Sequence, residues 1–201
     1  MSRMIKDMQC PYCQAKLTES AIECNYCNLS LKSANALLGP IPQLSSGIND
    51  FDATLDKKSQ KKINKSLSKL AERFPQVRMH VIINKFDPKY SLSTHLFWLF
   101  NQDSLSTSNR KGGKNHTVLL GLDSGRSCCA LMVGYGLEPF LARKALDHVL
   151  DKAQPSLSQG DYKDAILIII DELTQLMQET CKQLEDVLDI SEAETYQPIE
   201  Y

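Results

Sequence analysis

The stretch Thr117–Pro139, TVLLGLDSGRSCCALMVGYGLEP, predicts two strands joined by a tight turn and followed by a helix. The apolar runs Thr117–Leu122 and Ser127–Val133 each have about the length of a strand. Between them, Asp-Ser-Gly supplies the residue with positive φ that a tight hairpin needs. A helix is expected to start at Pro139 and to run to about Ala153.

Two glycines, Gly134 and Gly136, lie between the second of these strands and the expected helix. Backbone N–H groups and the positive end of a helix dipole meet in such a loop, so it is a candidate anion-binding loop. An ordinary strand-to-helix turn has the same pattern, and the pattern alone favours that simpler interpretation.

Composition excludes several classes of protein. With 201 residues, 42% of them apolar, the chain can bury one core and carry a small appendage. A net charge of −1 gives no general attraction to nucleic acid or to an anionic membrane. The sequence has no run of about 18 apolar residues and no signal-peptide core at its N-terminus. Seven cysteines, four of them in two C-x-x-C pairs, are typical of a reducing compartment, so we expect a cytoplasmic protein.

The two C-x-x-C pairs predict a metal site in residues 1–38. Cys10, Cys13, Cys24 and Cys27 offer the four soft ligands of a tetrahedral, structural zinc. Redox chemistry would need one C-x-x-C on a βα unit, and a pair of disulfides does not suit the cytosol. The segment resembles the zinc ribbons of many bacterial proteins, with Gln14 and Asn28 where those ribbons usually have glycine. The segment has few basic residues, among them Lys6, Lys16 and Lys32, which argues against strong nucleic-acid binding.

Beyond the ribbon, residues 39–47 are predicted to be a linker, because proline and glycine prevent regular structure there. In residues 48–184 the order of the expected strands and helices implies a layered α/β sandwich with a small sheet. Its first helix is expected to be rich in lysine, capped by Asp56 and ended by Pro75, and a strand follows at Arg78–Asn84. We then expect a helix at Leu92–Phe100, with His95 and Trp98 packed at its edges, and a polar loop at Asn101–His116. Pro155 should break the chain before a last helix, which is capped by Gly160-Asp161 and carries Leu184 on its apolar face. The acidic residues 185–201 are expected to form a frayed or disordered tail.

Four motifs in this order are similar to the TPM domain family: TVLLGL (Thr117–Leu122), DSGRSCCALM (Asp123–Met132), VGYGLEP (Val133–Pro139) and PSLSQGDYKDAI (Pro155–Ile166). The resemblance covers roughly Ile48 to Met177. The family includes a thylakoid-lumen protein, a photosystem II repair protein and an animal receptor modulator. It implies an α/β/α fold with acidic residues near the strand ends. Some members are described as acid phosphatases or calcium binders, and others serve the assembly or repair of membrane complexes through protein contacts.

Carried onto this chain, the resemblance implies a small set of candidate residues. NDFDATLD (Asn49–Asp56) places Asp50 at the family's acidic position, and Asp123 and Glu138 complete the catalytic candidates. A second metal, Ca or Mg, would be held by Asp50, Asn115 and Asp123. The family's Asp-Asn-Gly is replaced here by Asn115-His116-Thr117, so an amide stands in place of one carboxylate. Each carboxylate also has a structural interpretation: chain-entry cap for Asp50, turn former for Asp123, and helix N-terminal charge for Glu138.

The remaining reactive side chains give no catalytic pattern. The four histidines are scattered, and Cys128 and Cys129 fall on opposite faces of a strand as small apolar residues. We therefore expect a cytoplasmic, non-enzymatic protein with a zinc ribbon and a TPM-like domain, acting on unidentified protein partners in assembly or repair. The alternative is divalent-metal-dependent hydrolysis of phosphomonoesters.

Overall fold

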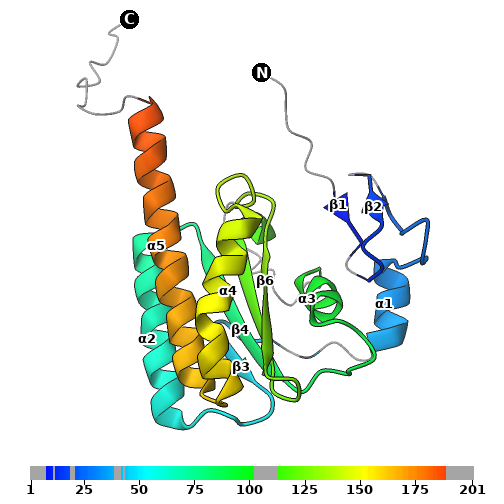
Figure 1. The fold of residues 1–201 in the computed structure, drawn as a ribbon, viewed down its shortest axis with the longest axis horizontal. Coiled ribbons are helices and arrows are strands. Elements are labelled where there is room, and N and C mark those ends of the chain that lie inside the picture. Colours follow the sequence, from blue (N-terminus) through cyan, green and yellow to red (C-terminus); the bar gives the residue numbers. More distant parts are fainter. Residues whose placement is uncertain are drawn as a thin grey trace, which may run out of the picture.

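The computed structural model of the protein describes residues 8–10, 12–18, 21–38, 42, 44–101 and 113–188 (Figure 1). Most of the predicted polar loop, part of the predicted linker and the tail after Leu188 lie outside the described residues.

A four-stranded sheet forms the centre of the fold. Its strands are β3 (Ile48–Asp50), β4 (Arg78–Asn84), β5 (Thr117–Asp123) and β6 (Cys128–Val133), in the order β3-β4-β5-β6. The first three are parallel, and β6 pairs with β5 in the antiparallel sense through the predicted hairpin. All seven residues of β5 are buried. The carboxyl ends of the three parallel strands consequently meet at one edge of the sheet.

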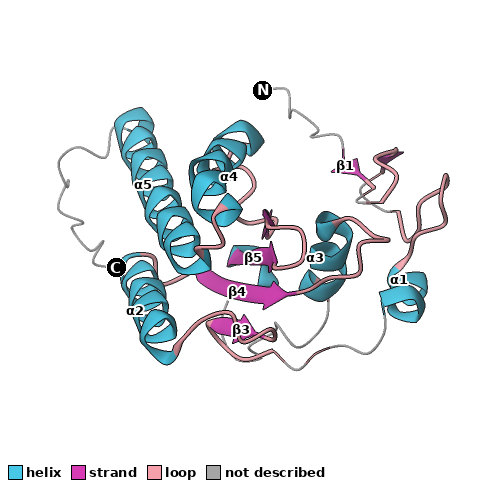
Figure 2. Ribbon diagram, turned by 60° about the horizontal axis from the view of Figure 1, so that its bottom comes forward, coloured by secondary structure: helices cyan, strands magenta, loops and turns pink. Residues whose placement is uncertain are grey.

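Helices cover both faces of this sheet (Figures 1 and 2). Helices α2 (Lys57–Arg73), α4 (Arg143–Ser158) and α5 (Tyr162–Leu188) pack on one face in a large apolar cluster. Helix α3 (Leu92–Phe100) covers the other face, and α1 (Leu31–Leu38) packs against α3. The α/β/α sandwich predicted from the sequence is confirmed.

Helix α2 forms as its sequence predicts. Asp56 caps it, because its Oδ1 accepts the backbone N–H of Ser59 at 2.7 Å. The predicted apolar face is buried at Ile63, Leu67 and Leu70. The opposite, lysine-rich side of the helix is exposed.

Several local predictions are wrong, and each has a packing reason. Helix α4 begins at Arg143 instead of Pro139, because Leu137 and Leu141 are buried in a series of turns before it. It also continues through Pro155, since Ala153 and Leu157 on either side are fully buried. In the hairpin the positive φ of 48° falls on Ser127 and not on Gly125.

Three further side chains differ in exposure from the prediction. His95 and Trp98 are 5% and 4% exposed, so they belong to the core and not to the edges of α3. Leu184, expected on the apolar face of α5, is 38% exposed. The turn of α5 that carries Leu184 therefore extends beyond the core of the domain.

The ribbon and the main domain are packed together. The ribbon has a two-stranded sheet of β1 (Met8–Gln9) and β2 (Lys16–Leu17), and α1 follows it. On α1, Ala34 is buried against α3, and Asn35 Oδ1 accepts the indole N–H of Trp98 at 2.6 Å. None of the helices in the described ranges has the length and apolar character needed to cross a membrane.

Candidate functional site

The four cysteines of the ribbon come together as a metal-binding geometry. Their sulfur atoms all lie within 4.8 Å of one another, with Cys10 Sγ 3.6 Å from Cys27 Sγ and Cys13 Sγ 3.6 Å from Cys24 Sγ. A tetrahedral ion with metal–sulfur bonds of about 2.3 Å requires sulfur atoms about 3.8 Å apart. The donor set therefore fits a four-coordinate metal with no open position.

Two equivalent turns hold these sulfur atoms. The N–H of Gln14 donates to the carbonyl of Cys10, and the N–H of Asn28 donates to that of Cys24, both at 2.8 Å. Gln14 and Asn28 have φ values of 61° and 56°, the left-handed conformation implied by the glycines of related ribbons. Backbone N–H groups of Tyr26 and Cys27 lower the pKa of the Cys24 thiol to about 7, which favours its thiolate.

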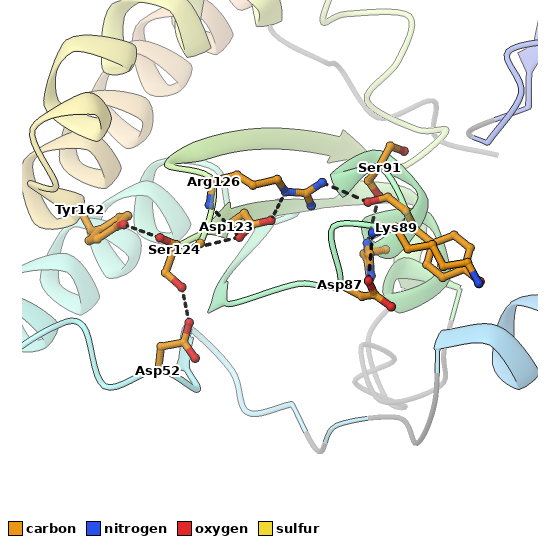
Figure 3. Close-up of polar contacts among 11 residues, drawn as sticks. Asp52, Asp87, Lys89, Ser91, Asp123, Ser124, Arg126 and Tyr162 are labelled. Carbon is orange, nitrogen blue, oxygen red and sulfur yellow. Dashed lines mark hydrogen bonds and ion pairs between the residues drawn. The ribbon is translucent and has the colours of Figure 1, made fainter.

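The carboxyl edge of the sheet carries a second polar cluster, centred on Asp123 (Figure 3). The Asp123 side chain is fully buried and accepts the N–H groups of Gly125 and Arg126 at 2.9 and 3.3 Å. Its other oxygen pairs with Arg126 Nε at 2.5 Å. The Arg126 guanidinium also donates from Nη1 to the carbonyl of Tyr90 at 3.1 Å. Asp123 is thus neutralised by a cation that belongs to its own turn.

Asp50 lies at the same edge but on the other face of the sheet. It pairs with Ile83, whereas Asp123 pairs with Asn84, one residue further along β4. Because alternate residues of a strand point to opposite faces, the two carboxylates diverge from strands about 10 Å apart. Asp50 accepts hydrogen bonds from Thr54 N–H, Thr54 Oγ1 and Leu55 N–H at 3.1, 3.2 and 2.8 Å. Its observed contacts are those of a cap on the turn that enters α2.

Asp52, which the sequence analysis did not single out, is the carboxylate that reaches the end of β5. Its Oδ2 accepts a hydrogen bond from Ser124 Oγ, and the carbonyl of Ser124 accepts one from the Tyr162 hydroxyl at 3.2 Å (Figure 3). The signal was present in NDFDATLD, where Asp52 follows Asp50 by two residues. The next residue, Ala53, has a φ of 52°, so the turn between β3 and α2 that carries Asp52 contains a left-handed residue.

The other predicted site residues lie at the opposite edge of the sheet. Asn115 precedes the first residue of β5, so about 20 Å of strand separates it from Asp123. The proposed trio of Asp50, Asn115 and Asp123 is therefore not brought together, because its members occupy two edges and two faces. Glu138 lies near Asn115, in the turns before α4.

The glycine loop also lies at this far edge. Gly134 N–H donates to the carbonyl of Thr117, and Gly136 N–H donates to that of Asn115, both at 2.9 Å. A Cβ on Gly136 would lie 2.9 Å from the backbone carbonyl oxygen of Asn115 and 2.7 Å from His116 Nε2, so a larger residue there would force the loop to shift. The loop serves to close the chain against β5. Its two glycine N–H groups are both used by backbone carbonyls of the chain itself.

Histidine and cysteine side chains near the sheet have the pKa shifts of buried groups. Burial lowers the pKa of His80 and of His95, which favours their neutral forms. Cys128 and Cys129 pack against the two opposite apolar clusters, as predicted, and burial raises the pKa of Cys129 to about 12. Within the described residues, the four ribbon cysteines are the one group of three or more His, Cys, Asp or Glu side chains that could hold a metal.

The fold and its sites define a class of protein: an α/β/α domain joined to a small four-cysteine ribbon. The family can be stated as well. The model of the TPM domain matches residues 48–176, well over half of the chain, and the chain belongs to this family. No curated protein matches the chain.

Solved structures share the fold at low sequence identity. The N-terminal domain of a protein from P. gingivalis matches with a TM-score of 0.51 and 16% identity over 67% of this chain and 83% of that one. The N-terminal domain of a Corynebacterium glutamicum protein matches with a TM-score of 0.52 and 11% identity over 82% and 95%. A protein of the psychrophilic bacterium Bizionia argentinensis matches with a TM-score of 0.54 and 14% identity over 65% and 86%. At these identities the likeness shows the fold alone.

Proposed function

We propose that this chain is a zinc-bearing TPM-domain protein of the cytoplasm that acts through protein contacts in assembly or repair, and not as a metal-dependent hydrolase. One observation carries the proposal: the strand-end carboxylates are already used by the chain's own donors. Asp123 is buried against Arg126, and Asp50 accepts three hydrogen bonds from the turn that follows it.

A divalent ion at Asp123 would have to displace the Arg126 side chain. The ion would have to replace the only cation that contacts the fully buried Asp123 carboxylate within the described residues, and the Arg126 side chain, 31% exposed, would lose this contact. A cation site also needs several convergent oxygen ligands, whereas Asp50 and Asp123 point to opposite faces of the sheet.

The outer face of α2 is the surface we propose for the protein partner. It presents Lys57, Lys58, Lys61, Lys62, Lys65 and Lys69, all exposed, and none of them forms an ion pair within the described part of the chain. Glu72 is the single acid of the helix, and Asp56 and Asp164 bound the lysines near its N-terminal end. This positive patch is short and has carboxylates at its ends. A short acidic protein segment therefore fits it better than a continuous polyanion, which would extend onto the flanking carboxylates and be repelled.

Zinc at the cysteine cluster is the second part of the proposal. Four sulfur donors with tetrahedral spacing favour zinc in a closed, structural site. When bound, the ion would supply most of the folding free energy of a segment that buries little else. Seven reduced cysteines support the cytoplasmic location.

Divalent-metal-dependent phosphomonoester hydrolysis remains the second candidate, with Ca or Mg as the ion. The observation in its favour is that Asp52, Asp123 and Ser124 gather at the carboxyl edge of the sheet. That edge is where ligands commonly bind in open α/β sheets.

Titration of Ca, Mg and Mn into the full chain, followed by calorimetry, separates the two candidates. We expect no saturable binding at millimolar ion and no hydrolysis of p-nitrophenyl phosphate, because Arg126 already neutralises Asp123. Binding of one ion per chain that is lost in Asp123→Asn, but kept in Glu138→Gln at the opposite edge, would establish the hydrolase candidate instead. For the contact surface, we expect charge reversal of Lys58, Lys62, Lys65 and Lys69 to abolish binding of a fluorescent oligoglutamate peptide. Reversal of Arg143 and Lys144 on α4 should leave it unchanged, and equal loss in both variants would remove α2 as the partner surface.

A further inference from the structure

We infer that the first cysteine turn of the ribbon holds Arg126 on Asp123 through Tyr90, so that metal binding in the ribbon stabilises the carboxyl edge of the distant sheet. The inference rests on the zinc site proposed above, and it assigns Tyr12 as a positioning residue. Three contacts make up the connection.

The first contact joins the ribbon to the loop before α3. Tyr12 lies between Cys10 and Cys13, so a metal bound by both cysteines fixes the turn that carries its ring. The ring centroid of Tyr12 lies 6.1 Å from that of Tyr90, with the planes tilted by 47°. Around this contact is a groove of about 270 Å³, whose lining includes Cys27 and Lys89. The ribbon thus touches the main domain directly beside its own metal site.

The second contact is made by Tyr90 itself, which is 6% exposed. Its ring meets His95 of α3 edge-on at 6.1 Å, and the ammonium of Lys89 lies 5.6 Å from the ring centroid. Its N–H donates to the carbonyl of Asp87 at 3.2 Å, which closes a turn outside any strand or helix. A loop held by so few backbone hydrogen bonds depends on the packing of this ring for its position.

The third contact carries the effect to the sheet. The carbonyl of Tyr90 accepts from Arg126 Nη1 at 3.1 Å, while Arg126 Nε pairs with Asp123 (Figure 3 shows Arg126 between Asp123 and this loop). A shift of Tyr90 removes one of the two anchors of the guanidinium. The turn that follows β5 then loses order, and with it the N–H groups of Gly125 and Arg126 that bind Asp123 Oδ1.

The second cysteine turn supplies a matched control. Tyr26 occupies in Cys24-Asn-Tyr-Cys27 the position that Tyr12 occupies in Cys10-Pro-Tyr-Cys13. Tyr26 is 79% exposed, against 50% for Tyr12, and has no ring contact with another described residue. Removal of either ring leaves all four cysteines in place, but of the two rings only that of Tyr12 contacts Tyr90.

Amide hydrogen exchange on the zinc-loaded full chain tests the connection, because the N–H groups of Gly125 and Arg126 report directly on the Asp123 turn. Removal of zinc by a chelator should speed exchange at these two amides about tenfold, and Tyr12→Ala with zinc retained should speed it several-fold, the scale of one aromatic contact. Tyr26→Ala should leave it unchanged. The amide of Leu120 in the middle of β5 should not respond in any of these samples.

Each other result overturns a defined part of the inference. Faster exchange confined to residues 8–38 after chelation would show that the ribbon and the sheet are not coupled. Equal effects of Tyr12→Ala and Tyr26→Ala would show that the coupling does not pass through Tyr90. If the purified chain holds no metal, the proposed zinc site fails, and Tyr12→Ala still decides whether the ring contact positions Arg126.

Discussion

The ribbon and the main domain of this chain pack against each other, but they differ in how much apolar surface each of them buries. Among the described residues 10–30, the two fully buried side chains are Cys10 and Cys24, while Ile22 and Tyr26 are 90% and 79% exposed. The main domain buries a continuous apolar cluster drawn from three helices and all four strands of its sheet. The comparison teaches that burial of apolar surface can stabilise the main domain, whereas the ribbon buries so little that the proposed zinc at its four cysteines would have to supply its stability.

The largest effect should follow from removing one ligand of the ribbon. Cys24→Ser should abolish metal binding, because structural zinc contributes about 10–16 kcal/mol to sites of this kind and an alcohol is a poor ligand in place of a thiolate. Metal analysis of the purified protein checks this. The helical circular dichroism of the main domain should persist, and its loss would mean that the domain too depends on the ion. Cys181→Ser, at an exposed cysteine of α5, serves as the control and should retain the metal.

The converse change acts on the core of the main domain. Leu120 is fully buried in the central strand, so Leu120→Ala should lower the free energy of unfolding by about 2–5 kcal/mol through lost burial and a cavity. Urea denaturation measures this. The zinc content of the folded protein should not change, because no ribbon ligand is touched. Release of zinc at urea concentrations below the unfolding transition would show that metal binding in the ribbon depends on the core of the main domain.

The smallest effect distinguishes the two cysteine turns from each other. Gln14→Gly should stabilise the loaded ribbon by about 0.5–1 kcal/mol, since glycine adopts the positive φ of this position without strain. Asn28→Gly should gain less, because asparagine tolerates the left-handed conformation better than glutamine does. Competition with a zinc chelator compares the two variants. An equal gain would show that the side chain at these positions carries no strain.

Periodicity and turn chemistry were sufficient to predict most of the fold. The strand at Arg78–Asn84, the helix at Leu92–Phe100 and the Asp56 cap were all correct, because each depends on residues close together in the sequence. The predicted start of α4 at Pro139 and the predicted break at Pro155 were wrong, since burial of Leu141 and Leu157 in a core built from distant segments decided both. Local preference is overridden where tertiary packing is strongest.

The two candidate sites also differ in how far the sequence could predict them. The cysteine cluster could be predicted, because two short turns present all four ligands and their spacing defines the geometry. The arrangement of Asp50, Asn115 and Asp123 could not be predicted. A strand of seven residues places Asn115 and Asp123 at opposite edges of the sheet, and the face on which each aspartate lies depends on the strand register. Arg126 was visible in the turn sequence, but its role as the counter-ion of Asp123 required the position of Tyr90, 36 residues earlier in the chain.

The chain has a single tryptophan, and the indole of Trp98 is bound to α1 by its hydrogen bond to Asn35. Indole emission responds to the polarity around the ring, and this ring is 4% exposed at the contact between the segment that follows the ribbon and α3. Separation of α1 from α3 would admit water to it and shift its emission to longer wavelengths. The protein therefore carries an intrinsic optical reporter of whether its two parts are docked, which requires no label and can be followed in real time.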